Sequence, residues 1–197
     1  ATTNGSVTRA DGGSGAATGT DLWSGADQGT VTGTLTRALP AHGAGLYRLV
    51  PQNTVPVPAA YTLTARHSGK LADVFNASTA DNANIVQWAT NGQPNQQWQF
   101  RDAGGGYFQV VSRNSGKCLD VAGASTGDGV RIIQWTCGTG TNQQWRIQDL
   151  GTGYIQLIAR HSNKCLDVLN AATTDGAQVV QWTCGSGTNQ QWERRQI

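Results

Sequence analysis

The tetrapeptide Asn-Gln-Gln-Trp occurs three times in this chain, at residues 95–98, 142–145 and 189–192, so that 47 positions separate each copy from the next. The same shift aligns further residues without a gap, and these include the chain's only lysines, Lys70, Lys117 and Lys164. A unit of this length is too small to bury a core of its own. The sequence therefore predicts three copies of one supersecondary structure, stacked or arranged around an axis.

Prolines separate the repeats from an unrelated N-terminal segment. Pro51, Pro56 and Pro58 lie in a stretch without periodic apolar residues, which is typical of a semi-rigid linker. We therefore expect two domains: an antiparallel β segment over residues 1–52 and, after a linker over 53–59, a repeat domain over 60–197. The repeats are predicted at about 60–106, 107–153 and 154–197.

The repeats have the pattern of short β-strands separated by turns. In the third repeat, residues 154–158, 165–168 and 178–182 have strand patterns. No stretch has an apolar stripe of helical period and length. The fold class is therefore all-β, and three units of about four strands indicate a β-trefoil, in which six strands close a barrel and six form hairpins over one end. A three-bladed stack or partial propeller is the rival architecture, but blades normally number four or more.

The composition argues against several classes of partner. The chain has 14 basic and 12 acidic residues and no run of either sign, whereas nucleic acid binding needs a clustered basic face. No apolar stretch approaches the roughly 18 to 20 residues that span a bilayer, so no membrane partner is expected. Ala1 leads into a polar segment without the pattern of a signal peptide, which indicates a mature or trimmed product.

The four cysteines predict two disulfides. Cys118 and Cys137 are 19 positions apart in the second repeat, and Cys165 and Cys184 have the same spacing in the third. Of the three possible connectivities, only these pairs make both repeats equivalent. A zinc site needs closely spaced Cys or His pairs, so no metal is expected. Disulfides indicate an oxidising environment, and we expect a secreted, extracellular protein.

The Gln-X-Trp motif of each tetrapeptide, together with Cys-Leu-Asp-Val upstream in two of the repeats, resembles the ricin-type β-trefoil lectins and the carbohydrate-binding modules of family 13. The resemblance covers about residues 59–197, with all three repeats in register. In that family the tryptophans that correspond to Trp98, Trp145 and Trp192 are core residues around the pseudo-threefold axis. Their burial would stabilise the fold strongly, so these three are expected to be scaffold.

The resemblance also implies a sugar pocket in each repeat. In the family, the aromatic residue fifteen positions after the repeated aspartate lies at the rim of a shallow pocket, where its ring packs against the C–H face of a pyranose. A carboxylate can accept two sugar hydroxyls, and an asparagine side chain can both donate and accept. The predicted sugar-binding residues are Asp73, Trp88, Asn95 and Gln96 in the first repeat, Asp120, Trp135, Asn142 and Gln143 in the second, and Asp167, Trp182, Asn189 and Gln190 in the third.

Simpler roles exist for each of these residues. The rim tryptophans could be packing residues, the aspartates could stabilise turns, and the glutamines could brace the aspartates instead of touching sugar. The residue three positions after the rim tryptophan is often polar in xylan-binding relatives. It is Asn91 in the first repeat but Gly138 and Gly185 in the others, so two sites lack one polar wall. A second repeated aspartate is expected in a turn, at Asp81, Asp128 and Asp175.

The N-terminal segment has a resemblance of its own. Asp-Leu-Trp at residues 21–23, followed by Pro-Ala-His-Gly at 40–43 and an apolar strand, is similar to the end of the C-terminal β-domain of family 27 glycoside hydrolases, of the α-galactosidase and β-L-arabinopyranosidase type. Those enzymes place their catalytic aspartates on a (β/α)8 barrel, for which this chain is too short. A glycosidase needs two positioned carboxyl groups, whereas carboxylates repeated threefold favour binding. We therefore expect a non-catalytic fragment without a cofactor.

Together these observations predict a secreted carbohydrate-binding β-trefoil with three sites, joined to the remnant of a glycoside hydrolase. The α-galactosidase-like segment favours terminal galactose or L-arabinopyranose as the ligand. Xylan or another plant polysaccharide is the second candidate, and a trefoil that serves as a protein-interaction or spacer module is the alternative of another class. Three weak sites on one body would raise the avidity for a multivalent glycan.

Overall fold

The structure is a computed structural model that describes residues 3–8, 16–32, 34–39, 46–51 and 59–197. The chain forms two compact units, Ala1–Val57 and Pro58–Ile197, and each is considered by itself. Of the residues predicted as a linker, all but Ala59 lie outside the described residues.

The N-terminal unit consists of short antiparallel strands. They are β1 (Thr3–Thr8), β2 (Ala16–Asp21), β3 (Asp27–Thr32), β4 (Thr34–Leu39) and β5 (Tyr47–Pro51). β1 pairs with β4, and β2 pairs with β3 on one side and β5 on the other. Asp21 ends β2, because its Oδ1 atom accepts the backbone N–H groups of Trp23 and Ser24 at 2.9 and 3.2 Å. The motif at residues 40–43 lies outside the described residues.

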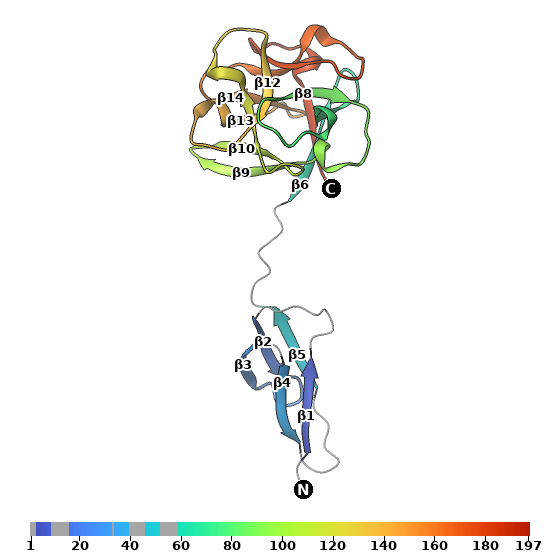
Figure 1. Cartoon of the computed structure of the whole chain (residues 1–197), viewed down its shortest axis with the longest axis vertical. Helices are drawn as coiled ribbons and strands as arrows, with labels where there is room; N and C mark the ends of the chain where they lie inside the picture. The colour runs from blue at the N-terminus through green and yellow to red at the C-terminus, as the bar shows by residue number, and fades with distance from the viewer. Residues whose placement is uncertain (1–2, 9–15, 33, 40–45, 52–58) are drawn as a thin grey trace. The chain divides into compact units, whose positions relative to one another are not determined.

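The C-terminal unit contains four strands in each repeat (Figure 1). The first repeat has β6 (Ala60–Ala65), β7 (Leu71–Val74), β8 (Ala83–Trp88) and β9 (Trp98–Gly104). The second has β10 (Tyr107–Ser112), β11 (Cys118–Val121), β12 (Val130–Trp135) and β13 (Trp145–Asp149). The third has β14 (Ile155–Ala159), β15 (Cys165–Val168), β16 (Val179–Trp182) and β17 (Trp192–Gln196). The strand patterns noted in the third repeat therefore agree with the structure to within one residue.

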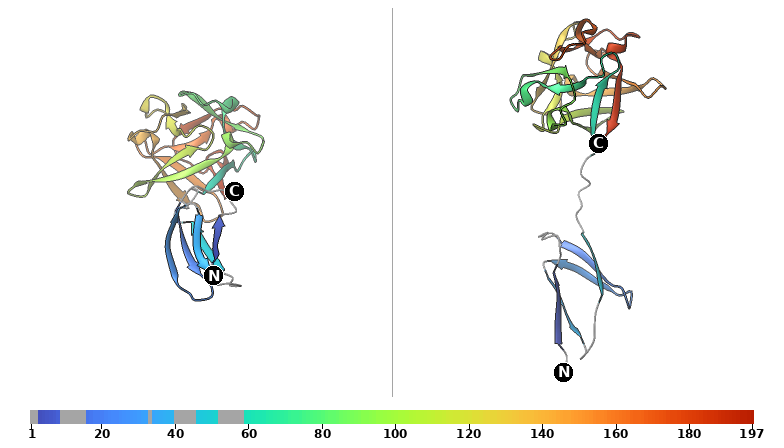
Figure 2. Two further views of the ribbon diagram at one scale, coloured as in Figure 1. Left: turned by 60° about the horizontal axis from the view of Figure 1, so that its bottom comes forward. Right: turned by 90° about the vertical axis from the view of Figure 1, so that its right-hand side faces the viewer.

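Six of these strands close a barrel. The antiparallel pairs run β6–β9, β9–β10, β10–β13, β13–β14 and β14–β17, and β17 returns to β6 over the register Trp192↔Ala65 to Gln196↔Tyr61. Closure satisfies the strand edges that an open sheet would leave unpaired. Figure 2 shows the barrel in two further views.

The other six strands form three hairpins, β7–β8, β11–β12 and β15–β16, which meet one another. β12 pairs with both β8 and β16, and Val86 on β8 forms a bridge with Gln178. The prediction of an all-β trefoil is confirmed, and the propeller alternative is wrong, because the repeats share one continuous sheet. None of the described segments is a helix of the length and hydropathy needed to cross a membrane.

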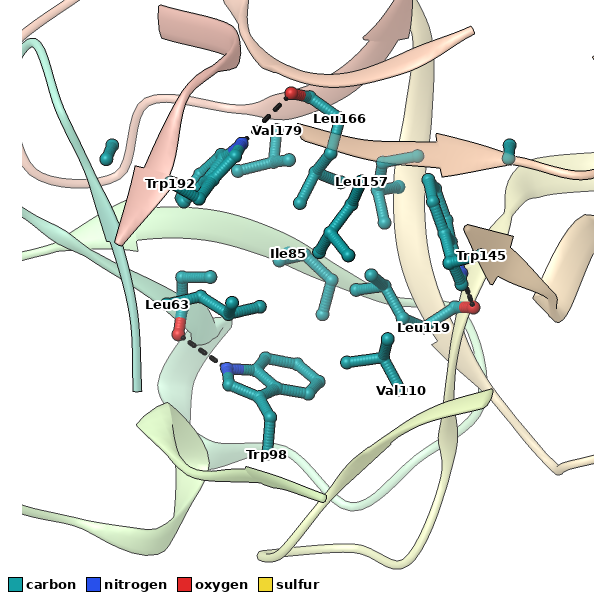
Figure 3. Packing of buried hydrophobic residues seen from close by; sticks show 14 of the residues in the cluster. Leu63, Ile85, Trp98, Val110, Leu119, Trp145, Leu157, Leu166, Val179 and Trp192 are labelled. Atoms are coloured by element: carbon teal, nitrogen blue, oxygen red, sulfur yellow. Dashed lines mark hydrogen bonds between the residues drawn. The ribbon is translucent and has the colours of Figure 1, made fainter. Parts of the chain in front are cut away.

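The tryptophans of the three tetrapeptides lie around the centre of the hydrophobic core. Trp98, Trp145 and Trp192 are completely buried, and Figure 3 shows their rings around a cluster of aliphatic side chains. Each indole Nε1–H donates a hydrogen bond to a backbone carbonyl, at 3.0 to 3.1 Å. The acceptors are the carbonyls of Ala72, Leu119 and Leu166. The burial expected for these residues is confirmed, and each of these three indole N–H groups has a partner.

Buried glutamines connect each repeat to its neighbour. Gln87 on β8 donates from its Nε2 atom to the carbonyls of Ala172 and Thr174 in the third repeat, at 2.6 and 3.0 Å. Its Oε1 atom accepts the hydroxyl of Ser68. Gln134 and Gln181 make the corresponding bonds, to the first and second repeats respectively. The repeats are therefore linked in a closed cycle.

The three lysines connect the same pairs of repeats at the surface. Their ammonium groups form ion pairs with the second repeated aspartate of another repeat, at 2.6 to 2.7 Å: Lys70 with Asp175, Lys117 with Asp81 and Lys164 with Asp128. These aspartates also accept the backbone N–H of Ala89, Thr136 or Thr183. Their role is wider than the turn that we expected, because each joins two repeats.

Two disulfides, Cys118–Cys137 and Cys165–Cys184, confirm the predicted pairing. Each joins the first residue of the hairpin's first strand to the segment that follows its second strand. In the first repeat Leu71 and Thr90 occupy these positions. By the chain-entropy model, closing a loop of this size stabilises the fold by roughly 3 kcal/mol.

We expect Trp145→Phe to lower the free energy of unfolding by about 1–3 kcal/mol, because the carbonyl of Leu119 loses its buried donor and the smaller ring leaves a gap. Urea unfolding followed by circular dichroism measures the change. The control is Trp135→Phe, at a tryptophan that is 44% exposed, which we expect to cost no more than about 0.5 kcal/mol. Equal losses in the two variants would contradict the core role of Trp145.

Candidate functional site

Each repeat places its aspartate on the second strand, on the face opposite the core. Ala72 and Val74 on β7 belong to the core cluster, and Asp73 between them points the other way, because successive side chains of a strand alternate. Asp73 is nevertheless only 3% exposed. Asp120 on β11 and Asp167 on β15 repeat this placement and are also buried.

A shallow hollow lies over each aspartate. We call these hollows the first, second and third sites, in repeat order. Their volumes are about 240, 340 and 380 Å³, small for ligand pockets. The aspartate, rim tryptophan and asparagine predicted for each repeat line the same hollow: Asp73, Trp88 and Asn95, then Asp120, Trp135 and Asn142, then Asp167, Trp182 and Asn189.

The rim tryptophans end the second strand of each hairpin, and their indole rings form one wall. Trp88, Trp135 and Trp182 are 36%, 44% and 41% exposed, in contrast to the buried tryptophans of the core. Each lies opposite the first residue of the aspartate strand; Trp135, for example, pairs with Cys118. The ring and the carboxylate are therefore held on two strands of one hairpin, and in two repeats a disulfide ties the first of these strands to the segment that follows the second.

A strained three-residue turn forms the opposite wall. The turns are η1 (Phe75–Ala77), η3 (Ala122–Ala124) and η5 (Leu169–Ala171), each directly after the aspartate strand. Their second and third residues have positive φ values of 48–62°. Asn and Gly tolerate this region, but alanine is strained there. Ala77, Ala124 and Ala171 all line the hollows, so the strain lies at the sites, as is common for ligand-binding backbone.

The side chains of each Asn-Gln-Gln-Trp tetrapeptide form hydrogen bonds with the strand that bears the aspartate. In the first repeat, Asn95 donates from Nδ2 to Asp73 Oδ2 at 2.8 Å and to the carbonyl of Val74 at 3.3 Å. Gln96 donates from Nε2 to the same Asp73 oxygen at 2.9 Å, while Trp98 bonds the carbonyl of Ala72. The other two repeats make the same set of bonds.

The predicted glutamines are used inside the protein. Besides Asp73, Gln96 donates to the carbonyl of Ala89, and its Oε1 atom accepts the backbone N–H of Asn91 at 2.9 Å. Gln143 and Gln190 have equivalent partners. Both ends of each amide are therefore occupied, and only Gln190 lines its hollow. This geometry favours the bracing role over contact with a ligand.

The asparagines differ between repeats. In the second and third repeats, the Oδ1 atoms of Asn142 and Asn189 lie 2.5 Å from where a Cβ atom would be on Gly140 and Gly187, so a side chain at either glycine would displace the asparagine. Gln93 occupies this position in the first repeat. There, Asn95 is 4% exposed and its Oδ1 atom is buried without a partner. A buried side-chain acceptor without a partner is uncommon in folded proteins.

The site carboxylates each have one oxygen that the described residues leave without a hydrogen bond. The bracing amides use Oδ2, and the hydrogen bonds of the described residues make no use of Oδ1 on Asp73, Asp120 or Asp167. Burial raises the pKa of all three carboxyls above its ordinary value of 3.8, although the bonds from glutamine and asparagine oppose this shift. The site is thus a partly desolvated acceptor beside an aromatic wall.

The neighbouring repeat holds the turn of each site in place. The Nε2 atom of His67 lies 2.9 Å from the carbonyl oxygen of Ala172, which directly follows the turn of the third site. The Nε2 atom of His161 lies 3.1 Å from that of Ser125, which directly follows the turn of the second site. At the first site, Asn114 Nδ2 donates to the carbonyl of Ala77 at 2.9 Å. Each of these half-buried positions is therefore a contact between repeats.

Sequence reasoning missed several residues of the sites. Asn76, Gly123 and Asn170 line the hollows with left-handed backbone. Their signal was present, since Asn-Ala or Gly-Ala follows the aspartate strand at the same 47-residue offset. Asn82 and Arg131 also line the second site, and no pattern in the sequence indicated them. The described residues contain no group of three or more His, Cys, Asp or Glu side chains that could hold a metal ion.

Comparisons with known proteins support this architecture. The family model of the ricin-type β-trefoil lectin domain-like proteins matches residues 46–135 and 141–197. A designed threefold-symmetric protein, ThreeFoil, is 54% identical over 70% of this chain and 99% of its own, with a TM-score of 0.69. An exo-β-1,3-galactanase from Clostridium thermocellum is 34% identical over 98% of this chain, with a TM-score of 0.71.

The match to the galactanase covers 45% of that enzyme's chain, so this chain spans less than half its length. A ricin B-like lectin from Macrolepiota procera, solved in complex with lactose, is 24% identical over 74% of this chain and 100% of its own, with a TM-score of 0.63, and shares the fold. No curated protein sequence matches the chain significantly.

We expect the repeated aspartates to titrate as two sets. Carbon-13 NMR of the carboxyl groups should give midpoints above 3.8 for Asp73, Asp120 and Asp167, because burial disfavours their charge. Midpoints below 3.8 are expected for Asp81, Asp128 and Asp175, because the lysine hydrogen bonds favour theirs.

The two sets of aspartates also have opposite effects on how the stability of the fold depends on pH. A raised pKa in the folded state contributes stability below 3.8 that is lost as the pH rises through the folded value, whereas a lowered pKa contributes stability above 3.8 that is lost on acidification. A single common midpoint for all six carboxyls would contradict the assigned environments.

Proposed function

The chain belongs to the ricin-type β-trefoil lectin domain-like family, and we propose that its trefoil is a carbohydrate-binding module with three sugar sites, one in each repeat. One observation supports this most directly. The same hollow is built three times, each with an exposed tryptophan on one wall and a carboxylate with a spare oxygen at its base. An aromatic face beside a hydroxyl acceptor suits a pyranose, which has a C–H face and a hydroxyl edge.

Each residue has a distinct task in this proposal. The indole of Trp88 stacks on the C–H face of the sugar, and Oδ1 of Asp73 accepts a hydroxyl through a charge-assisted hydrogen bond. Asn95 and Gln96 hold the carboxylate by its other oxygen, so the acceptor is oriented before the ligand arrives.

Three sites on one rigid trefoil favour branched or repetitive glycans. Each hollow is shallow, so a single sugar binds weakly. When a ligand spans two or three sites, the later contacts become intramolecular and the avidity rises by orders of magnitude. The cycle of bonds between repeats holds the sites at fixed separations, which restricts the glycans that can span them.

The sugar proposed is terminal galactose or L-arabinopyranose. The likeness to a galactan-degrading enzyme, at 34% identity, supports a galactose-containing ligand, as does the α-galactosidase-like N-terminal segment. Xylan is the second candidate, because Asn91 supplies a polar side chain in the first site. A glycan array carrying terminal galactose, L-arabinopyranose and xylo-oligosaccharides separates these ligands.

The module is proposed to bind without catalysing a reaction and to belong to a secreted glycoside hydrolase. Its two disulfides are compatible with an oxidising, extracellular environment. If no glycan perturbs the fluorescence of the exposed tryptophans, a protein-interaction or spacer role takes the place of the lectin role.

We expect isothermal titration with methyl β-galactoside to give a stoichiometry of about three, one per repeat. The change Asp120→Asn should lower it to about two, because an amide bonded through its carbonyl to Gln143 presents an N–H donor where the sugar needs an acceptor. The triple variant at Asp73, Asp120 and Asp167 should lose binding while keeping its circular dichroism spectrum.

The matched control is Asp81→Asn, which changes a repeated aspartate paired with Lys117 on the surface and should leave the stoichiometry at three. Full binding by the folded triple variant would show that the carboxylates are not sugar ligands. Unfolding of that variant would instead support a purely structural role for these aspartates.

A further inference from the structure

The third site borders a second hollow that the proposed function does not use. This hollow, of about 390 Å³, is lined by Leu150, Thr152, Gln156 and Gln191 and by Arg66 of the first repeat; we call it the Arg66 hollow. Gly185 lines both the third site and the Arg66 hollow. The two hollows therefore lie side by side, and the residue between them has no side chain.

The backbone at Gly185 does not require glycine. Its φ angle lies outside the left-handed region, and a Cβ atom there would meet nothing within 4 Å. The first repeat has Asn91 at this position. The consequence of the glycine is therefore that no side chain stands at this position between the hollows. The second repeat also has a glycine, Gly138, but Ala103 and Gly105 replace the walls that Leu150 and Thr152 provide in the third.

Arg66 is an oriented and uncompensated cation. Its Nη1 atom donates to Oε1 of Gln191 at 2.6 Å, and its guanidinium carbon lies 4.5 Å from the ring centroid of Tyr154. The side chain is exposed, and no carboxylate of the described residues forms an ion pair with it. A guanidinium held by two contacts can offer its remaining N–H donors to a planar anion with little loss of entropy, and carboxylates match that geometry best.

We propose that the third site binds two consecutive residues of a glycan, and that the second residue, in the Arg66 hollow, is an acidic sugar such as a uronic acid. This inference rests on the proposed sugar site at Asp167 and Trp182. The terminal sugar stacks on Trp182, the chain passes over Gly185, and the carboxylate of the next residue meets the guanidinium of Arg66. The third site then differs from the first in the length and charge of the glycan it prefers.

The test uses a background of Asp73→Asn and Asp120→Asn, which leaves the third site alone. The ligands for titration are methyl β-galactoside, galactosyl-galactose and galactosyl-glucuronic acid, with the same linkage in both disaccharides. We expect the acidic disaccharide to bind about fivefold tighter than the neutral one at low salt. Arg66→Gln should remove this preference without changing the affinity for methyl β-galactoside, and Arg66→Lys should retain part of it.

Two further variants test the role of Gly185 and the position of the cation. Gly185→Asn, which copies the first repeat, should reduce the advantage of either disaccharide over methyl β-galactoside. The control is Arg113→Gln, at the equivalent arginine beside the first site, where Nη1 bonds Gln97; it should change none of these affinities.

Equal affinities for methyl β-galactoside and both disaccharides would overturn this inference and leave the proposed function intact. An acidic preference that is absent, or that persists in folded Arg66→Gln, would also overturn it. Failure of all three ligands to bind would overturn both the inference and the proposed function.

Discussion

The structure depends on the attachment of each Asn-Gln-Gln-Trp segment to the strand that bears the site aspartate. The tryptophan bonds the carbonyl of the residue before the aspartate, the glutamine and asparagine bond the aspartate itself, and the asparagine also bonds the carbonyl of the valine after it. One segment thus joins the core to the site, because its indole fills the barrel while its amides orient the carboxylate. A change in the packing of Trp98 would therefore alter the position of the Asp73 carboxylate.

The contacts between repeats explain why the fold needs all three. Gln87 on β8 satisfies its amide with carbonyls of another repeat, and Arg66 bonds both the side chain and the backbone carbonyl of Gln191. Removing one repeat would leave the buried amide of Gln87 without these partners, at a cost of about 1–3 kcal/mol. At the second site, Asn82 of the first repeat lines the hollow and accepts a hydrogen bond from Arg131, so the geometry of that hollow depends on a contact between repeats.

Three nearly identical repeats do not produce three identical sites. Gly140 and Gly187 leave room for their asparagines, whereas Gln93 at the same position accompanies a buried, unpartnered Asn95 Oδ1 atom. Phe75 lies 6.1 Å from the ring of Trp88 and has no aromatic counterpart in the other repeats. Under the proposed function, differences at the positions around a common aspartate and tryptophan would allow each site to favour a different part of a glycan.

The sequence by itself determined the fold class, the threefold repeat, the disulfide pairing and the aspartate, tryptophan and asparagine of each hollow, because all of these repeat at a fixed spacing that a single chain displays. Which atoms remain available was decided only by the tertiary structure. The amides of Gln96, Gln143 and Gln190 are occupied on both sides, and Arg66 lines a hollow beside Gly185, more than a hundred positions away in the chain. Whether a side-chain amide already has all its hydrogen-bond partners, and which distant residues meet, depends on how the barrel closes. A local sequence pattern does not predict how the barrel closes.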